Sequence, residues 1–308
     1  DYVVGKIISP STQKSLIEDC HGRMIEVSKG ALIIGALGVR CATLEVVGSW
    51  QKIGEDGKME VLTEGGLFGK ATSIAINVSN LPEMIYQGHI TRENKKKCMK
   101  DFVSNVPEKE YNCPTIMMLG TSMSCGKTTM SRLLIPLLKK LNLKIVGVKL
   151  AGAGQYHDIL SMQDAGADVI FDFVNVGLPS TVCPPEEYHT AMSQLLSLVA
   201  REKPDLVIAE IGASPFEPYN GSIVLEKIEA QICLTVLCAS DPYGVLGVIN
   251  TFHLIPDLIG GIVTNNQAGV ELVEKLTGIR AICPTDQDAE VKLMSILREK
   301  LPSFLVNS

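Results

Sequence analysis

The sequence predicts an α/β protein in which a parallel, doubly wound sheet follows a small β module. From residue 114 onward, apolar runs of strand length alternate with helical stretches, which is typical of strands joined by helical crossovers. Before residue 80 the chain reads as short strands separated by turn-forming residues, with no helical period. A polar stretch lies between the two parts. The predicted segments are a β module at 1–80, a connector with one short helix at 81–113 and the α/β domain at 114–308.

The β module is defined by short apolar runs between turn signals such as Ser28-Lys-Gly30 and Gly65-Gly66. Their spacing favours a barrel-like or sandwich-like arrangement, because several short strands must bury one common apolar face. Strands are expected at 3–8, 23–27, 31–34, 42–48, 59–63 and 71–78.

The α/β domain is defined by near-continuous runs of valine, isoleucine and leucine, which suit parallel strands covered on both faces. Strands are expected at 115–119, 144–149, 169–173, 206–211, 232–238, 259–264 and 279–283. Helices are expected at 127–141, 185–201, 243–253, 270–276 and 286–301.

A glycine-bounded loop follows the first strand of this domain and has the pattern of a phosphate-binding loop, or P-loop. Such a loop turns its backbone N–H groups inward around phosphate oxygens, and the helix after it points its positive end at the same anion. Five residues separate the two glycines, whereas the usual pattern has four. A Gly-Lys-Thr tripeptide also begins ordinary helices, but the preceding strand and Gly120 favour the P-loop. The residues expected to contact the phosphates are Gly120, Thr121, Ser122, Met123, Ser124, Cys125, Gly126, Lys127, Thr128 and Thr129.

Polar residues at the carboxyl ends of other strands are further candidates, because ligands of such sheets bind at that edge. Lys149 can reach a phosphate or a substrate carboxylate, or it extends from a strand end into solvent. Asp158 follows a glycine-rich turn and either binds magnesium or caps a helix. Glu210 ends a very apolar run, where an unpaired carboxylate is costly, so bound magnesium or a hydrogen-bond network must meet it. Asn265 can read the edge of a base, or it belongs to an ordinary turn.

Composition limits the partners. The net charge of −6 gives no general attraction to nucleic acid or to an anionic membrane, so a small-molecule substrate is expected. No apolar run is long enough to cross a bilayer. The nine cysteines contain no Cys-x-x-Cys pair, and several lie inside apolar runs, which indicates reduced thiols and a cytoplasmic location.

The α/β part, over about residues 114–286, resembles dethiobiotin synthetase and its relatives among the P-loop enzymes. That family's loop, Gly-Thr-Asp-Thr-x-Val-Gly-Lys-Thr, has the same five-residue spacing, and a Pro-Ser pair matches Pro179-Ser180. The resemblance implies ATP and Mg²⁺ as cofactors and a homodimer. It implies that Lys127 and Lys149 contact phosphates and are catalytic, that Thr128, Asp158 and Glu210 hold magnesium, and that Asn265 contacts the base.

The substrate-facing positions differ from that family. Ser122-Met123 stands where the family has Asp-Thr, and Glu210-Ile-Gly-Ala-Ser214 where it has Glu-Gly-Ala-Gly-Gly. Dethiobiotin is therefore not the expected product, and the β module has no counterpart there. Candidate substrate residues are Ser180, Ser214, Glu217, Tyr219 and Asn220.

Three functional hypotheses follow. The first is an ATP- and magnesium-dependent ligase or phosphotransferase that activates a small carboxylate or carbamate by phosphoryl transfer. The second is a nucleotide-gated binding protein whose β module engages a partner. Switch-type ATPases carry an additional lysine early in the loop, and Ser122 at that position weighs against this hypothesis. The third is an N-acyltransferase, similar to proteins with a related loop, that holds the phosphates of coenzyme A.

Overall fold

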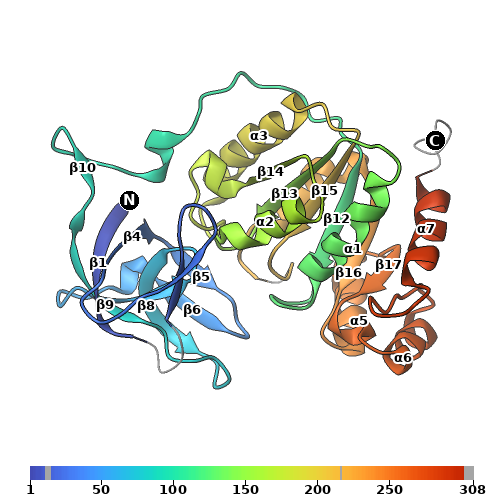
Figure 1. Cartoon of the computed structure of the whole chain (residues 1–308), viewed down its shortest axis with the longest axis horizontal. Helices are drawn as coiled ribbons and strands as arrows, with labels where there is room; N and C mark the ends of the chain where they lie inside the picture. The colour runs from blue at the N-terminus through green and yellow to red at the C-terminus, as the bar shows by residue number, and fades with distance from the viewer. Residues whose placement is uncertain (11–14, 216, 302–308) are drawn as a thin grey trace.

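The computed structural model describes residues 1–10, 15–215 and 217–301. A β-rich module and an α/β domain lie side by side, and the chain between them runs along the upper edge of the view in Figure 1. The predicted fold class is confirmed, because the second part contains six parallel strands with helices around them. Within the described residues, no helix combines the length and apolar character that a membrane span requires.

The N-terminal sheet has seven strands in the order β4-β1-β9-β7-β8-β6-β5. Strand β4 also pairs with β8, Ala36 opposite Leu67 and Leu37 opposite Phe68, so β4, β1, β9, β7 and β8 close into a ring. This is the barrel-like alternative. The strands are β1 (Tyr2–Ser9), β4 (Leu32–Leu37), β5 (Val39–Cys41), β6 (Val46–Ser49), β7 (Lys58–Thr63), β8 (Leu67–Ile74) and β9 (Glu83–His89), with a separate hairpin of β2 (Leu16–Glu18) and β3 (Met24–Glu26). Its core consists of Val3, Ile7, Met59, Val61, Phe68 and Met84.

Strand β9 corrects the expected connector. It lies between β1 and β7 in the ring, although its residues read as polar and were assigned to the segment between the domains. The reason is that Met84 is its only fully buried residue, while Glu83 and Gln87 face water. Instead of one ordinary helix, the segment continues with the β10 (Thr91–Arg92) and β11 (Lys95–Lys96) hairpin and the 3₁₀ helix η2 (Met99–Phe102).

The α/β sheet has the order β14-β13-β15-β12-β16-β17, and all its pairings are parallel. The strand that leads into the P-loop, β12, therefore lies between the strand that carries Glu210 and β16. This order places Gly120, Lys149 and Glu210 at the carboxyl ends of three neighbouring strands, on the same side of the sheet. The strands are β12 (Thr115–Gly120), β13 (Ile145–Ala151), β14 (Val169–Asp172), β15 (Leu206–Ile211), β16 (Ile232–Cys238) and β17 (Leu258–Gly260).

Helices cover both faces of this sheet. Alternate residues of β12 show the division: Ile116 and Met118 pack in the cluster of α1, α2 and α7, whereas Met117 and Leu119 pack in the cluster of α3, α4, α5 and α6. The helices are α1 (Lys127–Lys139), α2 (Tyr156–Asp164), α3 (Pro185–Arg201), α4 (Gly221–Ile228), α5 (Pro242–Phe252), α6 (Gln267–Thr277) and α7 (Ala289–Lys300).

The structure departs from the expected elements in several places. Helices α2 and α4 were not predicted, and both are short: α2 begins directly after a glycine-containing turn, and α4 begins with a glycine. The strand expected at 259–264 ends at Gly260, because Gly261 has a positive φ of 91° and a short 3₁₀ helix follows. The strand expected at 279–283 is wrong, since only an isolated bridge joins Ala281 to Ile259.

Candidate functional site

The P-loop connects β12 to α1 in the predicted position. Ser124 (φ 58°) and Gly126 (φ 105°) both adopt the left-handed conformation, which is typical of loops whose backbone N–H groups surround an anion. Gly126 has no room for a side chain, because a Cβ there would lie 2.7 Å from the Cα of Gly261. The Ile262 N–H donates to the Cys125 carbonyl at 3.1 Å, so the segment after β17 supports the loop from one side.

Lys127 is the first residue of α1 and is buried. Its Nζ donates to the carbonyl of Ser122 at 2.9 Å, across the mouth of the loop. In P-loops, the lysine at this position reaches the phosphates of a bound nucleotide. For Lys127 this contact stays a prediction.

Lys149 and Asp158 form an ion pair next to the loop. Lys149 is buried near the end of β13. It donates to the Ala153 carbonyl at 2.9 Å and to the carboxylate of Asp158, which lies in the first turn of α2. Burial acts to lower the pKa of Lys149, but Asp158, Glu210 and Asp172 outweigh it, so the pKa is raised. Lys149 therefore keeps its positive charge at this site.

Glu210 is buried near the end of β15, and its Oε2 has no hydrogen-bond partner within the described residues. Burial raises the pKa of this carboxyl, while Lys127 and Lys149 act in the opposite direction. The described residues thus do not complete the expected hydrogen-bond network around Glu210, because Oε2 has no partner among them. An unpaired buried carboxylate oxygen is costly, and it suits a site in which a cation completes its coordination.

One pocket of about 260 Å³ joins these groups. The predicted residues that line it are Met123, Ser124, Gly126, Lys127, Thr128, Thr129, Lys149, Asp158 and Glu210. Other predicted loop residues shape the loop without lining this pocket: Cys125 is fully buried, and the hydroxyls of Thr121 and Ser122 meet Ser240.

The β module supplies one wall of this pocket, through Arg40, Glu45 and Thr63. The Ser124 hydroxyl, inside the P-loop, donates to Glu45 Oε1 at 2.9 Å, and Glu45 Oε2 pairs with the guanidinium of Arg40 at 2.5 Å. The Thr63 hydroxyl donates to the Gly154 carbonyl at 3.2 Å. Sequence reasoning missed these three residues, because they lie about 60 to 85 positions before the loop and belong to no motif.

The β module also holds α2. Both carboxylate oxygens of Glu18 accept from backbone N–H groups at the start of this helix, those of Tyr156 (2.7 Å) and His157 (2.5 Å). A carboxylate at a helix N-terminus satisfies two free donors and favours the positive end of the helix dipole. Since Asp158 lies one residue further along, Glu18 helps to fix the position of a candidate magnesium ligand.

Asn265 lies just after the 3₁₀ helix η5 (Ile262–Thr264) and does not line the pocket. Its side-chain oxygen accepts from Asn266 at 3.1 Å. Its N–H donates to the Ile262 carbonyl, and the Ile262 N–H in turn donates to the Cys125 carbonyl of the P-loop. The contact of Asn265 with a base stays a prediction.

The candidate substrate residues lie against the β module rather than in the pocket. Glu217 Oε1 accepts from the N–H and the hydroxyl of Thr43 at 2.8 and 2.9 Å, and the Tyr219 hydroxyl accepts from the Cys41 N–H at 2.8 Å. Glu217 also accepts from the Ser214 N–H at 3.0 Å. The segment therefore binds the strand β5 region, and its role in substrate binding stays a prediction.

The other two candidate substrate residues have backbone partners. Asn220 donates to the carbonyls of Thr181 and Cys183, at 2.8 and 3.0 Å, and the Ser180 hydroxyl accepts from the Val182 N–H at 3.2 Å. These contacts organise the turn before α3.

Asp172 should make the stability of the protein depend on pH. It is buried beside Lys149 in the sheet, and burial raises its pKa to about 6. The ordinary pKa of aspartate is about 3.9, so the folded state holds this proton more tightly than the unfolded chain between pH ~4 and ~6. This contribution to stability falls as the pH rises through that window, by about 3 kcal/mol in total.

The variant Asp172→Asn tests this expectation, because an amide keeps an acceptor for the Val174 N–H but cannot ionise. Relative to the unmodified protein, its free energy of unfolding in urea should increase from pH ~4 to pH ~7 by up to about 3 kcal/mol. A difference that stays constant across this range would contradict the assignment.

Comparisons with known proteins add the following. No protein-family model matches the sequence, and no curated protein matches it. Among solved structures, HypB from Helicobacter pylori is 15% identical, with a TM-score of 0.40 over 63% of this chain and 89% of that one. Chloroplast FtsY from Physcomitrella patens is 14% identical, with a TM-score of 0.40 over 59% of this chain and 62% of that one.

A DUF1611 family protein from Anabaena variabilis is also similar, at 14% identity and a TM-score of 0.41, over 65% of this chain and 63% of that one. The matched part thus spans less than two thirds of the FtsY and DUF1611 chains. At such low identity these similarities concern only the general fold.

Proposed function

We propose that this protein is a magnesium-dependent, nucleotide-consuming enzyme that activates a small carboxylate or carbamate by phosphoryl transfer. The observation that carries the proposal is the convergence of Lys127, Thr128, Lys149, Asp158 and Glu210 on one pocket at the P-loop. Catalysis of this kind depends on positioning and on neutralising the charge of the transferred group. Lys127 would meet the β and γ phosphates, and Lys149 would lie between the γ-phosphate and the acceptor.

A magnesium ion would be held by Thr128, Asp158 and Glu210 together with phosphate oxygens. Within the part of the chain that the structure describes, no group of three histidine, cysteine or carboxylate side chains is arranged to hold a metal. This suits magnesium, which commonly takes one or two carboxylates and completes its shell with phosphates and water. The ion would neutralise phosphate charge and supply the unpaired Glu210 oxygen with a partner.

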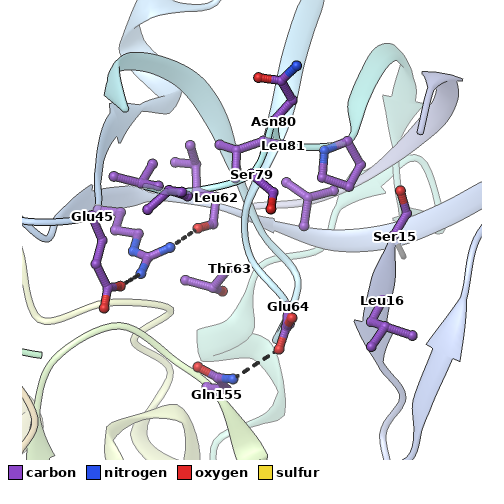
Figure 2. Close-up of a pocket in the computed structure, with 15 residues that line it drawn as sticks. Ser15, Leu16, Glu45, Leu62, Thr63, Glu64, Ser79, Asn80, Leu81 and Gln155 are labelled. Carbon is purple, nitrogen blue, oxygen red and sulfur yellow. Dashed lines mark hydrogen bonds and ion pairs between the residues drawn. The ribbon is translucent and has the colours of Figure 1, made fainter. Parts of the chain in front are cut away.

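A second cavity, of about 370 Å³, would be the binding site of the acceptor. It shares Arg40, Glu45, Thr63 and Gln155 with the P-loop pocket and lies largely within the β module. In the view of Figure 2, Thr63, Glu64 and Gln155 lie on the lower side of this cavity, and Ser79, Asn80 and Leu81 lie above them. A small acceptor bound there would be adjacent to the γ-phosphate, which would give the β module a direct role in substrate selection.

The test is nucleotide turnover in the presence of magnesium, measured by phosphate release from ATP and from GTP, with and without a panel of small carboxylic acids or of amines with bicarbonate. The proposal expects at least a tenfold stimulation by one class of acceptor. Turnover that no small molecule stimulates would contradict it. Tight binding of coenzyme A in competition with the nucleotide would favour the acyltransferase hypothesis instead.

The hydrogen bond between Ser124 and Glu45 favours a second candidate, a nucleotide-gated binding protein. It joins the P-loop directly to the β module, so occupancy of the loop would reach the module's surface. This candidate expects hydrogen exchange in β5 and β6 to change when nucleotide is added, together with turnover that acceptors do not stimulate.

A further inference from the structure

Arg40 occupies an unusual position at the boundary of the two parts of the chain. It comes from β5, lines both the P-loop pocket and the cavity of Figure 2, and its side chain is mostly buried. One terminal nitrogen donates to the Leu62 carbonyl and the other to Glu45, each at 2.5 Å. The dashed lines from Leu62 and Glu45 in Figure 2 meet this guanidinium. Its Nε is buried without a hydrogen-bond partner among the described residues.

Glu45 is the carboxylate that a nucleotide would disturb. The charged residues of the P-loop pocket are three cations and three carboxylates: Arg40, Lys127, Lys149, Glu45, Asp158 and Glu210. Under the proposed function, magnesium takes up the charge of Asp158 and Glu210. Glu45 would then remain beside the Ser124 hydroxyl, inside the loop that surrounds the phosphates. A carboxylate at this point repels the anionic triphosphate.

The guanidinium of Arg40 would lose its carboxylate partner at the same time. If Glu45 turns away from Ser124, the terminal nitrogen of Arg40 that faces it loses its partner, while the other keeps its bond to Leu62. A guanidinium held by one fixed hydrogen bond and offering free N–H groups is well suited to bind phosphate. Arg40 lines the same pocket as Lys149 and Asp158. Under the proposed function, Lys149 lies between the γ-phosphate and the acceptor, so Arg40 would lie at the γ-phosphate end of the nucleotide.

We propose that Arg40 is a γ-phosphate ligand supplied by the β module. In the nucleotide-free protein its guanidinium is occupied by the ion pair with Glu45, and the triphosphate displaces this carboxylate. The inference rests on the proposed function and assigns to the β module a role in completing the nucleotide site. It makes the site selective for nucleoside triphosphate over diphosphate, because only the triphosphate reaches the guanidinium.

The test compares dissociation constants for ATP and ADP with magnesium, measured by calorimetry on the full chain. If guanine nucleotides bind more tightly, GTP and GDP take their place. Arg40→Ala should weaken ATP binding at least tenfold and ADP binding less than twofold. Arg40→Lys should weaken ATP binding less than Arg40→Ala does, because lysine keeps the positive charge. Some ATP affinity should still be lost, because lysine lacks the planar guanidinium. Glu45→Gln should tighten ATP binding several-fold, because it removes the competing charge and keeps an acceptor for Ser124.

Lys70→Ala is the matched control, because it breaks a similar ion pair, with Glu60, elsewhere in the β module. It should change neither constant. Equal weakening of ATP and ADP by Arg40→Ala, or weaker ATP binding by Glu45→Gln, would overturn the inference while leaving the proposed function intact. Should the unmodified protein bind neither nucleotide, the proposed function itself is wrong and this inference with it. Circular dichroism on each variant separates loss of fold from loss of binding.

Discussion

Changing Glu210 to glutamine is expected to stabilise the metal-free protein and to abolish its magnesium-dependent turnover. Glu210 is buried, one carboxylate oxygen has no partner among the described residues, and burial raises its pKa. An amide of the same shape carries no charge, so burying it costs less. The free energy of unfolding should rise by about 1–3 kcal/mol near neutral pH.

The pH dependence of this gain has a definite sign. A carboxyl whose pKa is raised in the folded state lowers the free energy of unfolding only at pH values where the same carboxyl ionises in the unfolded chain. The stabilisation by Glu210→Gln should therefore vanish in acid and grow toward neutral pH. In contrast, turnover with magnesium should fall by roughly 10²–10³-fold, because the ion loses a charged ligand.

Glu60→Gln is the control for this experiment. Glu60 is also buried, but it pairs with Lys70 at 2.5 Å and accepts from the Ala71 N–H at 2.7 Å. Removing a satisfied charge should destabilise the protein and leave turnover unchanged. A Glu210→Gln variant that is less stable than the unmodified protein, or fully active, would be incompatible with a magnesium ligand held unpaired.

Changing Lys127 to alanine is expected to weaken the binding of ATP and of ADP by at least about 100-fold. The lysine is buried at the first position of α1, and among the described residues its amine donates to the Ser122 carbonyl and the Cys125 sulfur. A bound phosphate would offer a stronger, charge-assisted partner. Calorimetric titration with either nucleotide measures the loss.

The matched control is Lys140, at the other end of the same helix, α1. Lys140 follows the last residue of α1 and pairs with Glu290, both exposed, so Lys140→Ala should leave affinity and stability nearly unchanged. If Lys127→Ala binds nucleotide as tightly as the control does, the P-loop assignment is refuted. Because Lys127 would contact the β-phosphate, both nucleotides should be affected, unlike the selective effect expected for Arg40.

Local patterns in the sequence predicted the α/β domain well where one apolar period dominates. The strand 206–211 and the helix 185–201 have the predicted limits, because their apolar residues face a covered interior along their whole length. Strand β9 was missed for the opposite reason. Its polar residues face water, and its place in the sheet depends on pairing with β1 and β7, which lie far from it in the chain.

The candidate site divides in the same way. The sequence alone determined the P-loop and the strand-end residues Lys149 and Glu210, because strand polarity and loop spacing are local properties that fix which edge of a parallel sheet receives a ligand. Only the tertiary structure decided that Glu18 holds the start of α2, that Glu45 contacts Ser124, and that Arg40 lines the P-loop pocket. These contacts join residues about 80 to 140 positions apart, and they follow from how the closed β module packs against the α/β domain, which no local pattern encodes.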